Sequence, residues 1–212
     1  MPDAAARLHA IQSALADAAR VANRVPADVT LVAVSKNRTV DEIEALIDAG
    51  QRHFGENRVQ EAATKWPELR SRHPDVVLHM IGQLQSNKAE EAAALFDVIH
   101  SLDRPSLAAA LVKARWNGPT YVQVNIGEEE QKGGVAIGDL PAFLDQARDL
   151  QVAGLMAIPP AEVEPSPYFA LLAKLARRHG VSGLSMGMSG DYRAAVMLGA
   201  TVVRVGTALF ED

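Results

Sequence analysis

Eight short apolar segments, each followed by a stretch with helical spacing, indicate a parallel β-sheet with right-handed crossovers. Eight such units usually close into a barrel, so the sequence predicts the α/β class and a single (β/α)8 TIM barrel with an extra N-terminal helix. A doubly wound open sheet is the structural alternative. We expect one domain over residues 1–212, because a chain of 212 residues suits one hydrophobic core.

The extra helix is expected over residues 3–22, ahead of the first strand. Asp3 is a suitable capping residue, because its carboxylate can accept a hydrogen bond from the first helical turn. The apolar positions recur every three or four residues, which places them on one helix face: Leu8, Ile11, Leu15, Ala18 and Ala22.

The eight alternating units that follow can be assigned by residue range. The expected strands are 29–35, 51–55, 76–81, 97–101, 120–126, 152–157, 182–187 and 201–206. The expected helices are about 40–50, 57–72, 87–95, 105–116, 139–150, 166–179 and 190–199.

Composition narrows the class of protein. A net charge of −5 argues against a general nucleic-acid binder, since phosphate backbones favour clustered Lys and Arg. The absence of cysteine excludes disulfides, thiol catalysis and cysteine-zinc sites. No apolar run approaches the roughly 20 residues of a membrane span, and the first residues lack the pattern of a secretory signal. We therefore expect a cytoplasmic protein without membrane or nucleic-acid partners.

Period-two alternation predicts a polar cluster inside the barrel mouth. Lys36 ends the first strand and lies on the same face as Val34. Asn125 and Arg204 lie on the corresponding inward faces of the fifth and eighth strands. The opposite strand faces are apolar and should meet the helices. Because buried polar groups are costly without partners or a ligand, this cluster is a site candidate.

Two loops near the C-terminus have the composition of a phosphate site. Ser189 follows the seventh strand, and Gly206 and Thr207 follow the eighth; together they offer hydroxyls and free backbone N–H groups. Ser189 alone could equally cap the helix at 190–199, but barrel phosphate sites recur in the loops after strands seven and eight. An amine that can condense with an aldehyde, next to a phosphate site, indicates pyridoxal 5′-phosphate (PLP).

Other polar side chains have less specific interpretations. Asn57 follows the second strand and is expected to reach the barrel mouth, whereas Glu56 could cap or charge the next helix. His79 and His100 lie in strands and are interpreted as hydrogen-bonded core residues. No metal site is expected, because the histidines lack the paired spacing of metal ligands.

Taken together, the motifs resemble the pyridoxal-phosphate homeostasis protein family, single-domain PLP-binding barrels related to the N-terminal domain of alanine racemases. The resemblance covers nearly the whole chain in the family's order. It runs through residues 33–36, 53–61, 81–88, 124–126, 154–160, 184–189 and 203–207. The chain departs from the family in a short segment between Pro160 and Leu184 and in lacking a Phe-Gly-x-Arg stretch after the last strand.

The resemblance implies specific roles. Lys36 would hold PLP as a Schiff base, Ser189, Gly206 and Thr207 would hold the phosphate, and Arg204 would face the pyridine nitrogen. It implies a protein that keeps PLP available but unreactive within intracellular vitamin B6 homeostasis, with no catalytic residue of its own. Its partners would be PLP and apo PLP-enzymes that receive it, and we expect a monomer.

A PLP-dependent amino-acid racemase is the alternative function. A cation at the pyridine nitrogen keeps that nitrogen unprotonated, which weakens the ring as an electron sink but leaves racemisation open. Racemisation needs a base on each face of the α-carbon, and Lys36 supplies one. The racemase fold brings the second from a C-terminal domain, which we do not expect in a sequence that ends five residues after Thr207.

Overall fold

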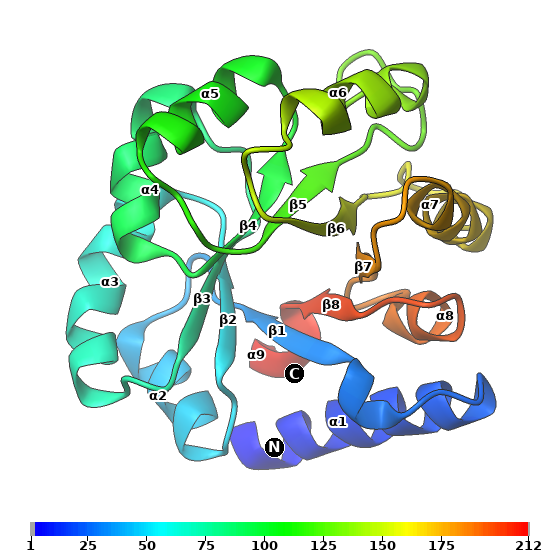
Figure 1. The fold of residues 1–212 in the computed structure, drawn as a ribbon. Coiled ribbons are helices and arrows are strands. Elements are labelled where there is room, and N and C mark those ends of the chain that lie inside the picture. The colour runs from blue at the N-terminus through cyan, green and yellow to red at the C-terminus, as the bar shows by residue number, and fades with distance from the viewer. Residues whose placement is uncertain (1–2, 212) are drawn as a thin grey trace.

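Eight parallel strands form a closed barrel in sequence order in the computed structural model, which describes residues 3–211 (Figure 1). Each strand pairs with its neighbours, and β8 pairs with β1, so the sheet has no open edge. The predicted (β/α)8 barrel is confirmed, and the open-sheet alternative is wrong. The strands are β1 (Thr30–Val34), β2 (His53–Glu56), β3 (Val77–Met80), β4 (Val98–Leu102), β5 (Thr120–Gln123), β6 (Val152–Met156), β7 (Gly183–Ser185) and β8 (Val202–Val205).

Helices surround the barrel, as Figure 1 shows. They are α2 (Val40–Asp48), α3 (Val59–Arg72), α4 (Ala89–Leu95), α5 (Pro105–Lys113), α6 (Leu140–Gln146), α7 (Ser166–Arg178) and α8 (Tyr192–Met197). Short 3₁₀ turns precede β1, α4 and α6, at Pro26–Asp28, Ser86–Lys88 and Ile137–Asp139. None of the helices within residues 3–211 is long and apolar enough to cross a membrane.

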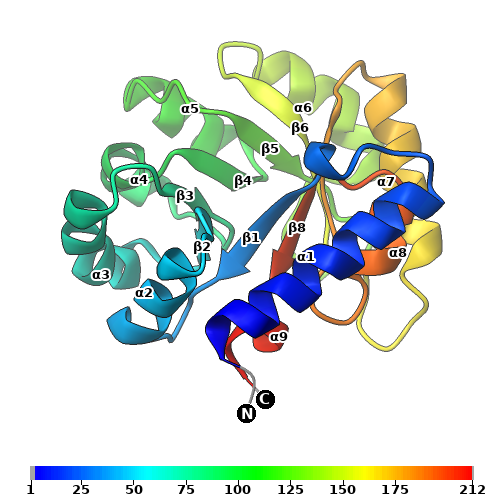
Figure 2. The same ribbon diagram turned by 90° about the horizontal axis from the view of Figure 1, so that it is seen from below.

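The extra N-terminal helix is confirmed as α1 (Ala4–Val21). The Asp3 side chain accepts the Ala6 N–H at its start. Figure 2 shows α1 running beneath the barrel beside α8 and the short C-terminal helix α9 (Thr207–Phe210). Arg7 donates to the Leu209 carbonyl at 2.8 Å, so α1 also supports the segment that follows β8.

The structure corrects one strand boundary and adds one helix near the barrel mouth. β5 ends at Gln123, three residues earlier than expected, because the chain turns into a loop in which the Asn125 side chain bonds both the carbonyl and the N–H of Glu129. The sequence pattern also missed α9, which is a single turn too short to show a period.

The core has two parts, and both follow the predicted strand alternation. The larger cluster lies between barrel and helices and includes Leu31, Ala33, Val203 and Val205. A smaller cluster fills the barrel interior. Its buried members come from β1, β5, β6 and β8: Val32, Tyr121, Met156 and Val202. Apolar packing thus fills one part of the interior and leaves the rest to polar side chains.

Histidines occupy that polar part of the interior. His79 on β3 and His100 on β4 are buried, and a 2.9 Å hydrogen bond joins His79 Nδ1 to His100 Nε2. Burial lowers the pKa of His79 to about 3 and that of His100 well below its usual value, since a charged imidazole would lose its hydration there. The interpretation of both as hydrogen-bonded core residues is confirmed.

These buried histidines should make the protein acid-sensitive. In the unfolded chain each takes up a proton near pH 6.5, whereas the folded state keeps both neutral, so stability is full above pH 6.5 and falls below it. Urea unfolding should show that the two histidines together lower the free energy of unfolding by about 2.5 kcal/mol between pH 7 and pH 5.5. In the His79→Gln variant the free energy of unfolding should fall only about half as much over this pH range. In His9→Gln it should fall as much as in the wild type, because the His9 side chain is exposed. Equal pH dependence in both variants would contradict the assignment.

Candidate cofactor site at the carboxyl end of the barrel

One cavity of about 580 Å³ gathers most of the predicted site. Five of the six residues singled out from the sequence line it: Lys36, Ser189, Arg204, Gly206 and Thr207. They come from the carboxyl ends of β1, β7 and β8, which the barrel closure makes neighbours. The cavity volume lies within the usual range for small-molecule sites.

Lys36 occupies a tight turn two residues beyond the end of β1. The Arg38 N–H donates to the Ser35 carbonyl at 3.1 Å, which closes the turn around Lys36 and Asn37. Asn37 has a φ of 58°, a left-handed conformation that asparagine tolerates better than most residues. The turn presents Lys36 to the cavity with an exposed side chain, and no hydrogen bond or ion pair holds its amine among the described residues.

An ionic cluster in which Glu56 is buried and Glu61 and Lys65 are partly exposed holds this turn from behind. The Ser35 hydroxyl donates to Glu56 at 2.7 Å, and Lys65 donates to the Ser35 carbonyl at 3.0 Å. On the other side of Lys36, the Asn37 N–H donates to Glu61 at 2.6 Å. Lys65 bridges the two carboxylates at 2.8 Å each. The residues before and after Lys36 are therefore both held by side chains from β2 and α3.

Glu56 is the residue of this cluster that sequence reasoning misread. It is fully buried rather than capping the next helix, and one carboxylate oxygen also accepts the Trp66 indole N–H at 3.0 Å. Strand alternation was the available signal, because Glu56 shares a face with Phe54 and so points toward α3. Its partners could not be identified before the position of α3 was known.

The two loops of the predicted phosphate side are joined directly. The Gly206 N–H donates to the Ser189 hydroxyl oxygen at 3.3 Å, whereas α8 begins only at Tyr192. The capping interpretation of Ser189 is therefore not what the structure shows. Gly187, with a φ of 97°, turns the chain after β7; a Cβ there would lie 2.6 Å from that of Ala195. Thr207 is exposed at the cavity, with its hydroxyl available to a ligand.

Arg204 is buried and supported only by neutral groups. Its Nη1 donates to the Ser185 hydroxyl at 2.5 Å, and its Nη2 donates to the Ala157 carbonyl at 3.1 Å. Burial lowers the pKa of Arg204 to about 10, partly opposed by the charge of Asp191. The guanidinium therefore remains charged at neutral pH, and its two hydrogen bonds to Ser185 and Ala157 leave some of its five donors for the cavity.

The charge of the cavity favours an anion. Lys36, Arg38 and Arg204 line it, against the single carboxylate of Glu211. Arg38 pairs with that carboxylate and lies over the Phe210 ring, so the other two cations have no ion-pair partner among the described residues. A phosphate monoester carries a charge of about −1.5 to −2 at neutral pH. Amine, hydroxyls and excess positive charge thus fit a phosphorylated aldehyde.

Two asparagines expected at the barrel mouth do not line this cavity. Asn57 follows β2 but does not line the cavity; its backbone packs against Gly82, where a Cβ would lie 2.2 Å from the Asn57 carbonyl oxygen. Its predicted part in cofactor binding stays a prediction. Asn125 does not line the cavity either, because its amide is used by the loop to Glu129. Among residues 3–211, no group of three His, Asp or Glu side chains could hold a metal ion.

Comparisons with known proteins agree with this geometry. Residues 8–212 match the family described as alanine racemase, N-terminal domain. The pyridoxal phosphate homeostasis protein of Pseudomonas aeruginosa is 42% identical over 214 residues, covering 94% of this chain and 91% of that protein.

Among solved structures, PipY of Synechococcus elongatus with PLP bound is 38% identical, with a TM-score of 0.77 over 92% of this chain and 99% of that one. Alanine racemase of Corynebacterium glutamicum shares the fold at 18% identity and a TM-score of 0.67; this chain covers 60% of its length. High identity over nearly the full length of the first relatives shows that the chain belongs to the pyridoxal phosphate homeostasis protein family, built on the alanine racemase N-terminal domain fold.

Proposed function

We propose that this protein binds PLP in the cavity at the carboxyl end of the barrel and acts in PLP homeostasis. The observation that carries the proposal is the meeting of Lys36 with Ser189, Gly206 and Thr207 in one cavity. The PLP-bound structure of PipY and the homeostasis proteins of the same family support it.

Lys36 is the proposed attachment point. The cofactor supplies an aldehyde, and the Lys36 amine would add to its carbon with loss of one water, giving a Schiff base. The clamp made by Glu56, Glu61 and Lys65 fixes the backbone on both sides of Lys36. A fixed backbone shortens the search of the long lysine side chain, because only its own torsions remain free.

The loops after β7 and β8 would hold the phosphate. The hydroxyls of Ser189 and Thr207 face the same cavity, and the Gly206 N–H already joins the loops through Ser189. Arg204 would face the pyridine nitrogen from the barrel interior. A charged guanidinium is a donor only, so it accepts no proton and favours an unprotonated ring nitrogen. An unprotonated ring nitrogen makes PLP a weaker electron sink for a carbanion, which suits storage of PLP.

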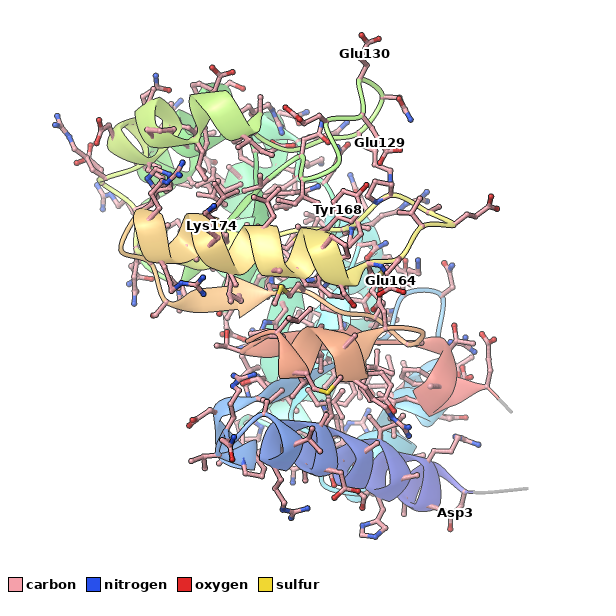
Figure 3. All side chains as sticks on the ribbon, turned by 90° about the vertical axis from the view of Figure 1, so that its right-hand side faces the viewer. Asp3, Glu129, Glu130, Glu164, Tyr168 and Lys174 are labelled. Atoms are coloured by element: carbon pink, nitrogen blue, oxygen red, sulfur yellow. The ribbon has the colours of Figure 1, made fainter. Side chains whose placement is uncertain are left out.

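An amino-acid racemase is the second candidate, favoured by the fold shared with alanine racemase. It needs a second base opposite Lys36. Within the described part of the chain, none of the three tyrosines lines the cavity. Tyr121 is buried in the barrel interior, Tyr192 lies in the outer core, and Tyr168 lies on α7 (Figure 3). The carboxylate of Glu211 is paired with Arg38.

The proposal includes delivery as well as storage. A carrier of an aldehyde must release it, and apo PLP-enzymes are the proposed recipients. Reversal of the same step, by water addition at the Schiff base, would free Lys36 and the aldehyde together. We also propose that the protein is a monomer and acts in the cytoplasm, as expected from the sequence.

Reductive trapping should identify the attachment residue. After incubation with PLP and borohydride reduction, peptide mass mapping should find the pyridoxyl group on Lys36, and Lys36→Met should abolish covalent retention. Lys132→Met is the matched control, because Lys132 lines the adjoining cavity and pairs with Glu129 at 2.6 Å. A label on Lys65, Lys88 or Lys132 in place of Lys36 would overturn the assignment.

Removing the hydroxyls should weaken PLP binding through its phosphate. A hydrogen bond to a charged group contributes about 1.5–3 kcal/mol, so Ser189→Ala or Thr207→Val should raise the dissociation constant of PLP by roughly ten- to a hundredfold. Pyridoxal, which lacks the phosphate, should bind wild type and variants alike. Ser182→Ala, an exposed serine at the other end of β7, is the control. Unchanged PLP affinity in both site variants would remove these loops from the phosphate site.

Turnover assays should separate the two candidate functions. With L- or D-alanine and a panel of other amino acids, the PLP-loaded protein should give no racemisation above that of free PLP, because, among the described residues that line the cavity, the one carboxylate that could act as a base beside Lys36, Glu211, is paired with Arg38. It should instead restore activity to an apo PLP-enzyme. Robust racemisation that disappears in Lys36→Ala would reject the carrier function in favour of the racemase.

A further inference from the structure

A continuous line of hydrogen bonds crosses the barrel interior below the proposed cofactor site. It starts at Arg204 on β8, whose Nη1 donates to the Ser185 hydroxyl on β7 at 2.5 Å. Ser185 Oγ lies 2.8 Å from His100 Nδ1 on β4. His100 Nε2 lies 2.9 Å from His79 Nδ1 on β3, and His79 Nε2 lies 3.0 Å from His53 Nδ1 on β2.

The far end of this line opens at the opposite end of the barrel. His53 is only partly buried and lines a second cavity of about 330 Å³, between α1 and the amino ends of β1 and β2. The line therefore connects a buried guanidinium beneath one cavity with an imidazole at another. Four contacts in series, contributed by five different strands, make a built network rather than a chance contact.

Arg204 fixes the direction of every hydrogen in the line. A guanidinium only donates, so Ser185 Oγ accepts from it and must place its own single hydrogen elsewhere. The acceptor within reach is His100 Nδ1, which therefore carries no hydrogen. A neutral His100 then has its hydrogen on Nε2 and donates it to His79 Nδ1.

The same rule repeats down the line. His79 Nδ1 accepts, so His79 donates from Nε2 to His53 Nδ1, and His53 keeps a free Nε2–H for the open cavity. The reverse direction would give Ser185 two donors and leave its own hydroxyl hydrogen buried without an acceptor among the described residues, which is costly. The neutral state agrees with the lowered pKa values of His79 and His100.

We infer that Ser185, His100 and His79 are positioning residues that hold Arg204 as a buried cation without a carboxylate partner. Every dipole in the line presents its acceptor end toward Arg204, and successive hydrogen bonds polarise one another in a low-dielectric interior. No ion pair to Arg204 occurs within residues 3–211: Asp191 acts on its charge without a salt bridge, and the guanidinium lines the cavity. This inference rests on the proposed function for its consequence, that Arg204 faces the pyridine nitrogen.

The hydrogen positions can be tested on wild-type protein without cofactor. In protein labelled with ¹⁵N-histidine, NMR should show His79 and His100 neutral, with the hydrogen on Nε2, at every pH between 5.5 and 8. Exposed His9 serves as the reference for a solvated imidazole. A hydrogen on Nδ1 of either residue, or a charged imidazole at pH 7, would overturn the inference. This measurement needs neither a variant nor bound PLP.

The positioning role has its own matched pair of variants. Ser185→Ala removes the link to Arg204, whereas Ser101→Ala removes a hydroxyl that is equally buried but lacks a hydrogen-bond partner among the described residues. In the cofactor-free protein, Ser185→Ala should speed exchange of the Arg204 guanidinium hydrogens about tenfold and let His100 populate both tautomers. Ser101→Ala should change neither quantity. Unchanged exchange and tautomer in Ser185→Ala would reject the positioning role.

PLP titration then separates this inference from the proposed function. Ser185→Ala should weaken PLP binding about tenfold, and Ser101→Ala should leave it unchanged. If wild type binds no PLP, the proposed function fails while the tautomer and exchange results still decide the network. If wild type binds PLP and Ser185→Ala binds it equally well, the proposed function stands and the link from Ser185 to the cofactor is rejected.

Discussion

The pairing of β8 with β1 is the constraint on which the site depends. Thr30 pairs with Val202 and Ala33 with Val205, so the last strand lies beside the first in parallel register. Lys36 is thereby brought next to Gly206 and Thr207, from which it is separated by about 170 residues of chain. Without closure, an open sheet would leave the amine and the phosphate loops at opposite edges. The helix α1 reinforces this seam through Arg7 and the Leu209 carbonyl.

Two polar systems of different character support the site. Behind Lys36 the support is ionic, with Glu56, Glu61 and Lys65 exchanging hydrogen bonds around the turn. Behind Arg204 it is neutral, with a serine and histidines in place of a carboxylate. The difference has a chemical consequence. A carboxylate beside the guanidinium would neutralise it, whereas neutral dipoles stabilise the charge and leave its field in the cavity.

The same barrel fold occurs in the pyridoxal phosphate homeostasis proteins and in alanine racemase. The shared feature is a strand-end lysine facing phosphate loops, which only requires closed topology and short turns. Catalysis requires additional groups in the cavity at the right distance from the substrate. In this chain the described tyrosines are used for packing on α7, in the outer core and against His100, where Tyr121 stacks at 4.6 Å.

Much of the fold and part of the candidate site could be predicted from the sequence, because the spacing of apolar residues reflects secondary structure. Alternating apolar segments predicted the barrel and the inward faces of β1 and β8, with Lys36 and Arg204 on them, and the composition of two loops predicted Ser189, Gly206 and Thr207. Local chemistry also predicted the Asp3 cap of α1. What the sequence could not reveal were contacts between distant segments, because strand alternation gives the face of a side chain but not its partner. Only the tertiary structure showed that Glu56 lies beneath the Lys36 turn and that Asn57 and Asn125 do not line the cavity. It also aligned three histidines with Ser185 and Arg204. Barrel closure and strand stagger decide which inward side chains come within hydrogen-bonding distance, and neither can be read from one strand's pattern.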